Sequence, residues 1–339
     1  MSRSKRIALM LAVVSTVLGA AVVAGTGSPA DAQQTYEMKI ATVAPGDGTP
    51  WEAQLQEFKR YVEGESGGRI RVRAFMGGSL GGEKALVRRT ANGSLQCFAG
   101  STAALGTLVP ELNVIEAPFI FPNERVADRK LDSDRVEQIV SRALEARGFR
   151  FGMWAENGYR SWFTKERVIE TPDDLRGLRM RSQEAIVHLE TYRAFGASPV
   201  PIDVTNVLTS LQTGVVDGFD NTPLFAFATS WYQAANHMTT SRHSYQPGII
   251  AYSKSWYDTL PADLQAVLDN VPDEITTNGR RGVRRMTPIL MRNLARRGIT
   301  MHDLSDEQRQ AFADVASRVP NQIAAKSGRN GRALLRALR

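Results

Sequence analysis

Apolar and polar residues follow two different periods along this chain. Over 38–43 and 70–74, apolar residues recur at every second position or in a short run, which predicts β-strands. Between these strands, a helix is predicted to begin at Thr49, because every third or fourth residue after it is apolar: Trp51, Leu55, Phe58 and Val62. Strands that alternate with helices in this way predict an α/β fold.

The same alternation continues to the carboxyl terminus. Further strands are predicted over 149–154, 178–181, 215–216 and 248–253. Further helices are predicted over 83–92, 124–146, 185–195, 203–213 and near 224–235, and a mostly helical region begins near Pro261. One straight helix is not expected in that region, because it contains Pro272, Gly279, Gly282 and Pro288. From about Gly328 we expect a basic, frayed end.

The first 32 residues have the order of a secretory signal peptide. Basic residues over 3–6 precede an apolar run over 7–24, and small residues then lead to Ala30-Asp31-Ala32. We therefore predict cleavage after Ala32 and a free protein in the periplasm. The apolar run is nearly long enough to span a bilayer, so an uncleaved membrane anchor is the alternative.

Charge and cysteine content narrow the class of protein. The formal net charge is +7, but the arginines are scattered, whereas a nucleic-acid binder would concentrate them on one stripe. The densest cluster, 280–285, is interpreted as a solvated helix face, and no nucleic-acid partner is expected. The single cysteine, Cys97, excludes an internal disulfide.

The chain contains no recognisable catalytic motif. Its four histidines are far apart, and the H-E-x-x-H, C-x-x-C and G-x-S-x-G patterns are missing from the sequence. The glycine-rich stretch 77–84 lacks the end of a phosphate loop and is interpreted as a turn before a helix. We therefore expect no enzyme, metal or cofactor. A hydrolase whose catalytic groups converge from distant positions is the alternative.

Polar residues stand where predicted strands end. Arg181 ends one strand, 154–160 follows another, and 219–223 follows a third. Ligands of α/β sheets bind in the crevice beyond the carboxyl ends of the strands. Because the planar guanidinium of arginine donates two parallel hydrogen bonds, this pattern favours a carboxylate ligand.

A series of short motifs, in order along the chain, resembles the solute-binding subunits of TRAP (tripartite ATP-independent periplasmic) transporters of the dicarboxylate-binding class. The motifs occupy 77–82, 92–95, 117–121, 156–160, 171–181, 195–201, 211–218 and 260–265. The resemblance implies a two-lobed α/β periplasmic binding protein fold with crossing strands between the lobes and a helical carboxyl-terminal region. It also implies a monomer that captures a small organic carboxylate for import by TRAP membrane subunits.

The size of the chain also favours two lobes, because it exceeds what one hydrophobic core usually serves. No change of composition marks a linker, so the chain is expected to cross between the lobes more than once. The first lobe is predicted over 33–157 and about 246–285, and the second over 158–245 and about 286–327. A basic tail is predicted over 328–339.

The resemblance also implies roles for individual residues. Arg181 matches the arginine that forms a salt bridge with the ligand carboxylate, Arg160 a second assisting arginine, and Asn221 an asparagine that caps the same carboxylate. Arg160 could instead pair with Glu156, and Asn221 could be a turn residue. Four further residues complete the candidate ligand-binding set, near the hinge or at strand ends: Ser101, Trp154, Tyr159 and Phe219.

Departures from the family pattern concern the pocket. Ser182-Gln183 stands where Val-Pro is usual, Phe219 precedes Asp220 where Gln-Glu is usual, and Val204 stands where an aromatic residue frequently lies. Ser101 stands where sialic-acid binders have an acidic residue, so sialic acid is not expected. A less polar pocket makes a hydrophobic or lipid-like ligand the alternative, and a sensor receptor is an alternative partner. Aromatic residues of 219–232 could line the pocket or simply pack in the core.

Overall fold

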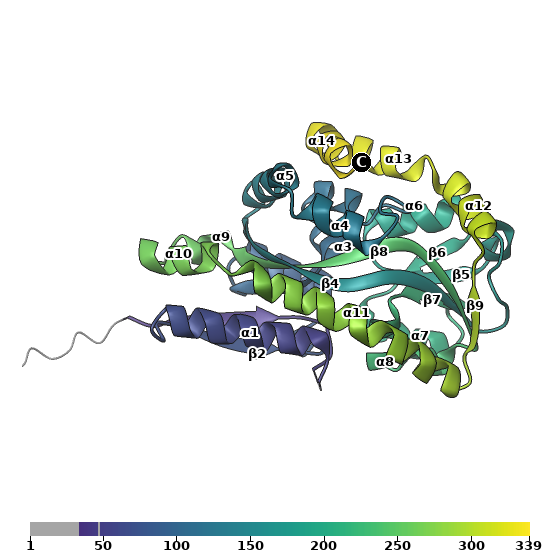
Figure 1. Cartoon of the computed structure of the whole chain (residues 1–339), viewed down its shortest axis with the longest axis horizontal. Helices are drawn as coiled ribbons and strands as arrows, with labels where there is room; N and C mark the ends of the chain where they lie inside the picture. The colour runs from purple at the N-terminus through teal and green to yellow at the C-terminus, as the bar shows by residue number, and fades with distance from the viewer. Residues whose placement is uncertain (1–33, 47) are drawn as a thin grey trace, which may run out of the picture. The chain divides into compact units, whose positions relative to one another are not determined.

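The computed structural model describes residues 34–46 and 48–339 (Figure 1). The predicted signal peptide and its cleavage site lie outside these residues. Residues 35–339 form one compact unit. Within the described ranges, no helix has both the length and the apolar character needed to cross a bilayer.

A mixed nine-stranded sheet runs through this unit in the order β2-β1-β3-β8-β4-β7-β5-β6, with β9 beside β8. The two central strands, β4 and β8, are long and antiparallel, and they lie side by side in Figure 1. The strands are β1 Tyr36–Ala41, β2 Ile70–Phe75, β3 Cys97–Ser101, β4 Phe149–Thr164, β5 Arg179–Ser182, β6 Ser198–Pro201, β7 Gly218–Asn221, β8 His237–Ser253 and β9 Thr300–Asp303.

The central strands join two halves of the sheet. The end of β8 pairs with β3 from Gly248 onwards, and the end of β4 pairs with β7 from Ser161 onwards. The two strands therefore cross between the β2-β1-β3 half and the β7-β5-β6 half in opposite directions, which confirms the predicted crossing strands. The limits of the two lobes remain a prediction.

The crossing strands extend well past the predicted limits of 149–154 and 248–253. The full length of these strands could not be predicted from the sequence, because polar residues such as Glu156, Arg160 and Gln246 break the apolar pattern. These side chains are nevertheless buried, and each has polar partners inside the protein. Buried polar groups are tolerated when their hydrogen bonds are satisfied.

Helices surround the sheet. The predicted start of α1 is confirmed: the Thr49 hydroxyl accepts a hydrogen bond from the Glu52 amide at 3.2 Å. The helices are α1 Pro50–Glu65, α2 Glu83–Ala91, α3 Thr102–Leu105, η1 Pro110–Val114, α4 Glu124–Leu131, α5 Asp134–Glu145, η2 Pro172–Leu175, α6 Ile186–Ala194, η3 Val204–Asn206, α7 Val207–Gln212, α8 Pro223–Ala228, η4 Trp231–Ala234, α9 Lys254–Tyr257, α10 Ala262–Asp269, α11 Asp273–Arg296, α12 Asp306–Ala316, α13 Val319–Lys326 and α14 Gly328–Leu338.

Three predicted elements differ from the structure. The helix expected over 124–146 is two helices, α4 and α5, and the helix expected near 224–235 breaks at Ser230, whose φ is 60°. The strand expected over 215–216 is wrong, because Val215 is 48% exposed and its amide bonds back to the Ser210 carbonyl. The strand begins at Gly218 instead.

The expected interruption is confirmed at Pro272, which lies between α10 and α11. It is wrong at Gly279, Gly282 and Pro288, because α11 is continuous for 24 residues. Its glycines serve close packing: a side chain at Gly279 would overlap Gln54, and one at Gly282 would press on Pro50 of α1. In Figure 1, α11 accordingly lies alongside α1. Pro288 is exposed and is accommodated within the helix.

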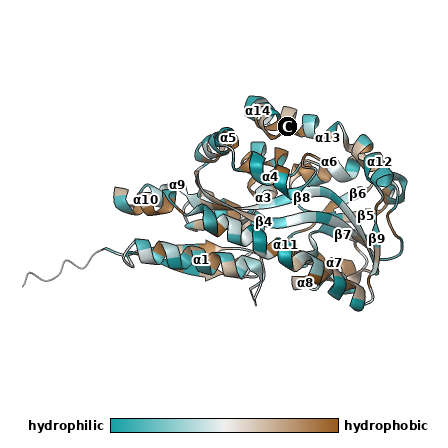
Figure 2. Cartoon of the chain, viewed as in Figure 1, coloured by the Kyte–Doolittle hydropathy of each residue, from teal (hydrophilic) through white to brown (hydrophobic). Residues whose placement is uncertain are grey.

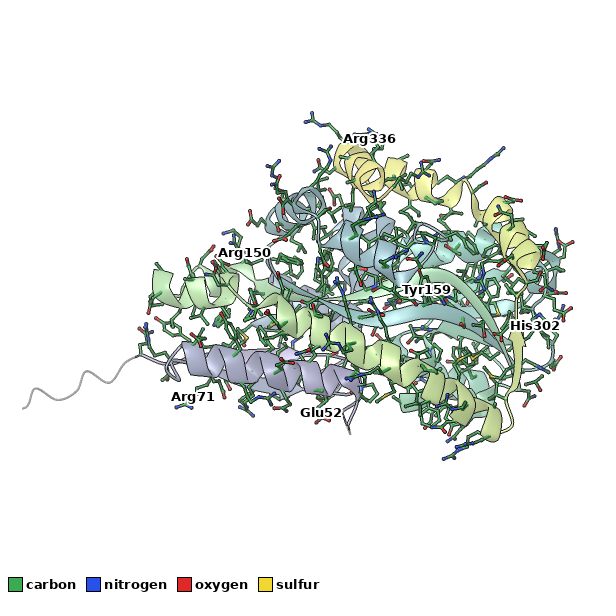
Figure 3. All side chains as sticks on the ribbon, viewed as in Figure 1. Glu52, Arg71, Arg150, Tyr159, His302 and Arg336 are labelled. Atoms are coloured by element: carbon green, nitrogen blue, oxygen red, sulfur yellow. The ribbon has the colours of Figure 1, made fainter. Side chains whose placement is uncertain are left out.

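The carboxyl-terminal residues form helix α14, so the expected frayed end is wrong. The helix buries Leu334, Leu335 and Leu338 beside α5, whereas Arg336, labelled in Figure 3, is exposed. Figure 2 shows both hydrophilic and hydrophobic residues on α14. The abundant arginines obscured the helical spacing of the leucines.

Truncation of a buried leucine of α14 tests this packing. Leu334 is fully buried in the large core cluster, so we expect Leu334→Ala to lower the free energy of unfolding by about 2–5 kcal/mol. Urea denaturation measures the effect, with Arg336→Ala as the exposed control on the same helix. If both variants are equally stable, α14 does not pack as described.

Candidate ligand-binding site

A cavity of about 390 Å³, a volume that includes solvent at its open side, lies where the two halves of the sheet meet. Its wall is formed by the loop after β1, the end of β3, the starts of α1 and α2, the crossing strands, and the ends of β5 and β7. The lining residues are Thr42, Val43, Ala44, Trp51, Glu83, Gly100, Ser101, Asn157, Arg160, Arg181, Gln183, Val204, Asn221, Phe225, Trp231 and Gln246.

Arg181, on β5, is a buried cation in this wall, with 3% of its surface exposed. Its Nε and Nη2 donate to the Ile202 carbonyl at 3.1 and 2.9 Å, and its guanidinium lies 5.0 Å from the centre of the Trp231 ring. No carboxylate among the described residues forms a salt bridge with it. Burial, and then the charge of Arg160, lower the pKa of Arg181 to about 10. The side chain therefore stays charged at neutral pH without an anionic partner.

Arg160, on β4, is already neutralised. Its Nε donates to Asp220 Oδ2 at 2.5 Å, and its Nη2 donates to the Asp220 carbonyl at 2.7 Å. Burial by itself would raise the pKa of Asp220, but the Arg160 charge and a hydrogen bond from His243 hold that pKa well below its usual range. The alternative pairing with Glu156 is absent, because Glu156 binds Arg284 at 2.7 Å.

Asn221 ends β7 beside the crossing strand β4, with Ser161 as its register partner. Its side-chain carbonyl accepts a hydrogen bond from the Thr222 amide at 2.8 Å. The side-chain amide has no acceptor within the described part of the chain. Asn221 is thus both a turn residue and a hydrogen-bond donor available to the cavity.

A group of hydrogen-bonded polar side chains covers another part of the wall. Glu83 Oε1 accepts from the Ser101 amide at 2.8 Å, and Glu83 Oε2 accepts from Gln183 Nε2 at 2.7 Å. Gln183 Nε2 also lies 2.7 Å from Ser101 Oγ. Burial raises the pKa of Glu83. These bonds connect α2 and β3, in one half of the fold, to the end of β5 in the other.

The structure brings Arg181, Arg160, Asn221 and Ser101 together and places the other three candidates elsewhere. Phe219 lies in the core, where its ring stacks on that of Phe163 with centroids 4.7 Å apart. Its ring also packs edge-to-face against the Trp231 ring, with centroids 5.5 Å apart.

The two remaining candidates face away from the cavity. Trp154 packs 5.0 Å from Phe151 in the core. The Tyr159 hydroxyl, labelled in Figure 3, donates to the Phe121 carbonyl at 3.0 Å, and the Arg242 guanidinium covers its ring at 4.3 Å. A β-bulge between Glu156 and Gly158 explains this, because alternate residues of a strand face opposite sides and the extra residue shifts that alternation. Trp154 before the bulge and Tyr159 after it therefore share one face of β4, and Arg160 lies on the other.

Several lining residues were not predicted from the sequence, namely Trp51, Glu83 and Gln183. Trp51 and Glu83 stand in the first turns of helices that follow strands. The rule that placed the ligand beyond strand ends could have found both of them. Phe225 and Trp231 are the residues of the aromatic stretch 219–232 that line the cavity.

A cavity between the two halves of an α/β fold, with the cation of Arg181 unpaired in its wall, is typical of a ligand-binding protein. The model of the bacterial extracellular solute-binding proteins, family 7, matches residues 40–327. The chain belongs to this family, whose members are periplasmic binding proteins of the two-lobed α/β fold.

Two curated relatives and two solved structures illustrate the similarity. A solute-binding protein of Verminephrobacter eiseniae is 32% identical over 71% of each chain. The C4-dicarboxylate-binding periplasmic protein DctP of Rhodobacter capsulatus is 27% identical over 86% of this chain and 87% of that protein.

Both solved structures are 26% identical to this chain and cover 90% of it. The sugar acid binding protein of Advenella mimigardefordensis, in complex with galactonate, has a TM-score of 0.83 and is 98% covered. The TRAP periplasmic solute-binding protein of Citrobacter koseri, with bound D-glucuronate, has a TM-score of 0.82 and is 99% covered.

The Arg160–Asp220 pair predicts a large effect of Asp220→Asn. This change leaves a buried guanidinium without its counter-charge, so we expect a loss of about 3–5 kcal/mol in the free energy of unfolding at pH 7. Because the pKa of Asp220 is lowered on folding, its contribution is present at neutral pH and lost as the pH falls below the pKa of an unfolded aspartate.

Urea denaturation at pH 7 and at acidic pH measures both effects. The variant should lose less stability on acidification than the unaltered protein. Asp173→Asn removes one partner of an exposed ion pair and is the matched control, with an expected change of about 0.5 kcal/mol. An equally small effect for Asp220→Asn would contradict the assigned pair.

Proposed function

We propose that the protein binds a small organic acid in the periplasm, without catalysis, and delivers it to the membrane subunits of a TRAP transporter. The observation that supports this most is Arg181, a buried arginine that faces the cavity without an anionic partner. The relatives that bind galactonate and D-glucuronate take ligands of the same chemical class, the carboxylates. We also propose that the protein works as a monomer.

The ligand carboxylate docks on Arg181. Two of its guanidinium nitrogens are held by the Ile202 carbonyl, which fixes the plane of the group and leaves Nη1 for the ligand. The side-chain amide of Asn221 lies in the same wall and supplies a second donor. Arg160 acts mainly by holding Asp220 and adds positive potential, since its own charge is paired.

The composition of the wall disfavours the alternative ligand, a hydrophobic or lipid-like molecule. Such a ligand would leave Arg181 desolvated without an anionic partner, and the side-chain amide of Asn221 without an acceptor. The apolar members of the wall, Val204, Phe225 and Trp231, would instead contact the carbon skeleton of an organic acid.

One arrangement resembles the catalytic groups of a hydrolase. Ser241 Oγ lies 2.7 Å from His243 Nδ1, and His243 Nε2 lies 3.3 Å from Asp220 Oδ2. All three side chains are buried, and none of them lines the cavity. Because a nucleophile must reach its substrate, this set serves the core rather than a reaction.

We further propose that ligand binding stabilises a closed state. At the edge of the cavity, Lys84 of α2 pairs with Glu184 at 3.0 Å, and Gly82 lies against the Asp203 carboxylate. These contacts join the two halves of the fold. A ligand held by both halves favours the state in which both reach it, by no more than its difference in affinity for the two states.

The variant Arg181→Gln tests how this guanidinium affects ligand affinity and, separately, the stability of the protein. We expect the affinity for the organic acid to fall by roughly 100-fold or more, because the ligand charge loses its partner. We expect the unliganded variant to be as stable as the unaltered protein or more so, because a buried, unpaired charge is removed.

A thermal-shift screen of organic acids first identifies a ligand. Calorimetry then measures the affinity of each variant for that ligand, and thermal unfolding measures the stability of each variant without it. Arg176→Gln, in an exposed ion pair, is the control. Unchanged affinity of Arg181→Gln would contradict the proposed carboxylate site.

Gly82→Ala tests the closed state. The added methyl group would overlap the Asp203 carboxylate, which is itself held by the Thr205 amide and hydroxyl at 3.0 and 2.8 Å. We expect weaker ligand binding with little change in stability, and recovery of affinity in the double variant Gly82→Ala/Asp203→Ala. Calorimetry on the three variants measures this coupling. Full affinity of Gly82→Ala would show that closure at this contact is not needed.

A further inference from the structure

Glu83 places a second, opposite charge in the cavity that contains Arg181. Its carboxylate is held by neutral donors, the Ser101 amide, the Ser101 hydroxyl at 3.2 Å and Gln183 Nε2. Within the described ranges, no lysine, arginine or histidine forms a salt bridge with it. Burial raises the pKa of Glu83, but the three donors on its two oxygens favour the anionic form, which has no salt-bridge partner.

The charges of the cavity constrain the ligand. Arg160 and Asp220 neutralise each other, which leaves Arg181 and Glu83 as the two uncompensated charges. A ligand carboxylate on Arg181 removes the first. Near Glu83 the wall is otherwise neutral, since its remaining polar members are Ser101, Gln183 and Gln246. No cation of the cavity wall is left to receive a second carboxylate.

The hydrogen bonds of Glu83 show which group it can accept. A carboxylate offers about four acceptor positions, and protein donors occupy three of them: one on Oε1 and two on Oε2. One position on Oε1 remains. A hydroxyl group needs one acceptor, whereas an ammonium group needs three. The remaining position therefore matches a ligand hydroxyl.

We propose that Glu83 restricts the site to polyhydroxylated monocarboxylic acids and excludes dicarboxylic acids. The inference rests on the proposed carboxylate-binding function and specifies its ligand class. The carboxylate of the ligand binds Arg181, and a hydroxyl at its other end donates to Glu83. A second carboxylate at that end would meet a like charge and an acceptor without a proton.

Pairs of acids that differ only at one end test this directly. Galactonate and galactarate have the same hydroxylated chain, but a terminal hydroxymethyl group of the first is a carboxylate in the second. Gluconate with glucarate, and erythronate with tartrate, are equivalent pairs of other configuration and length. Isothermal titration calorimetry at neutral pH measures the affinity of the unaltered protein for both members of each pair.

We expect the unaltered protein to bind the monocarboxylate of at least one pair about 100-fold or more tightly than the dicarboxylate. In Glu83→Gln, the dicarboxylate should bind more tightly than before, so that this ratio falls about tenfold or more. Glu37→Gln is the matched control: it removes the same charge from the exposed Arg73–Glu37 pair, outside the cavity wall. It should keep the original ratio.

The possible results separate the two proposals. If the unaltered protein binds a dicarboxylate as tightly as its monocarboxylate partner, the inference about Glu83 is wrong and the carboxylate function stands. The same holds if Glu83→Gln folds and keeps the full ratio, or if an amino acid analogue with a terminal ammonium group binds more tightly than the hydroxylated acid. If no acid of any pair binds, the proposed function itself is contradicted, and this inference with it.

Discussion

The buried guanidinium of Arg181 is the constraint on which the site depends. A charged group enclosed in a protein is costly unless it is paired, and here the partner groups are a backbone carbonyl and the face of Trp231. The neighbouring Arg160 pair shows the contrast, because the same fold supplies Asp220 to one arginine and no carboxylate to the other. This difference underlies our proposal that Arg160 is structural and that Arg181 binds the ligand.

The two crossing strands make this arrangement possible. Strand β4 positions Arg160 and Asn157, and β8 positions Gln246, so the floor of the cavity belongs to segments shared by both halves of the sheet. The side walls come from opposite halves, with Glu83 and Ser101 on one and Arg181 and Gln183 on the other. The hydrogen bond from Gln183 to Glu83 joins the two side walls without burying a further charge pair.

Much of this could be predicted from the sequence, where local patterns reflect local causes. Arg181, Asn221 and Ser101 lie in a common wall because the end of a strand is a local feature, and their role in ligand binding remains a prediction. The long strands were underestimated, since their buried polar residues find partners far away in the sequence. Gly279 and Gly282 were wrongly predicted to interrupt a helix for a related reason. They allow α11 to pack closely on α1, and no local pattern in the sequence shows that contact. The hidden helix α14 and the inward orientation of Glu83 likewise depend on tertiary contacts.

A crystal structure of the protein with a bound organic acid tests the central claim most directly. The account requires a ligand carboxylate oxygen within hydrogen-bond distance, about 2.7–2.9 Å, of Arg181 Nη1, while Arg160 remains on Asp220. A ligand whose carboxylate lies away from Arg181, with that guanidinium bound only to the Ile202 carbonyl as in the unliganded protein, would contradict it.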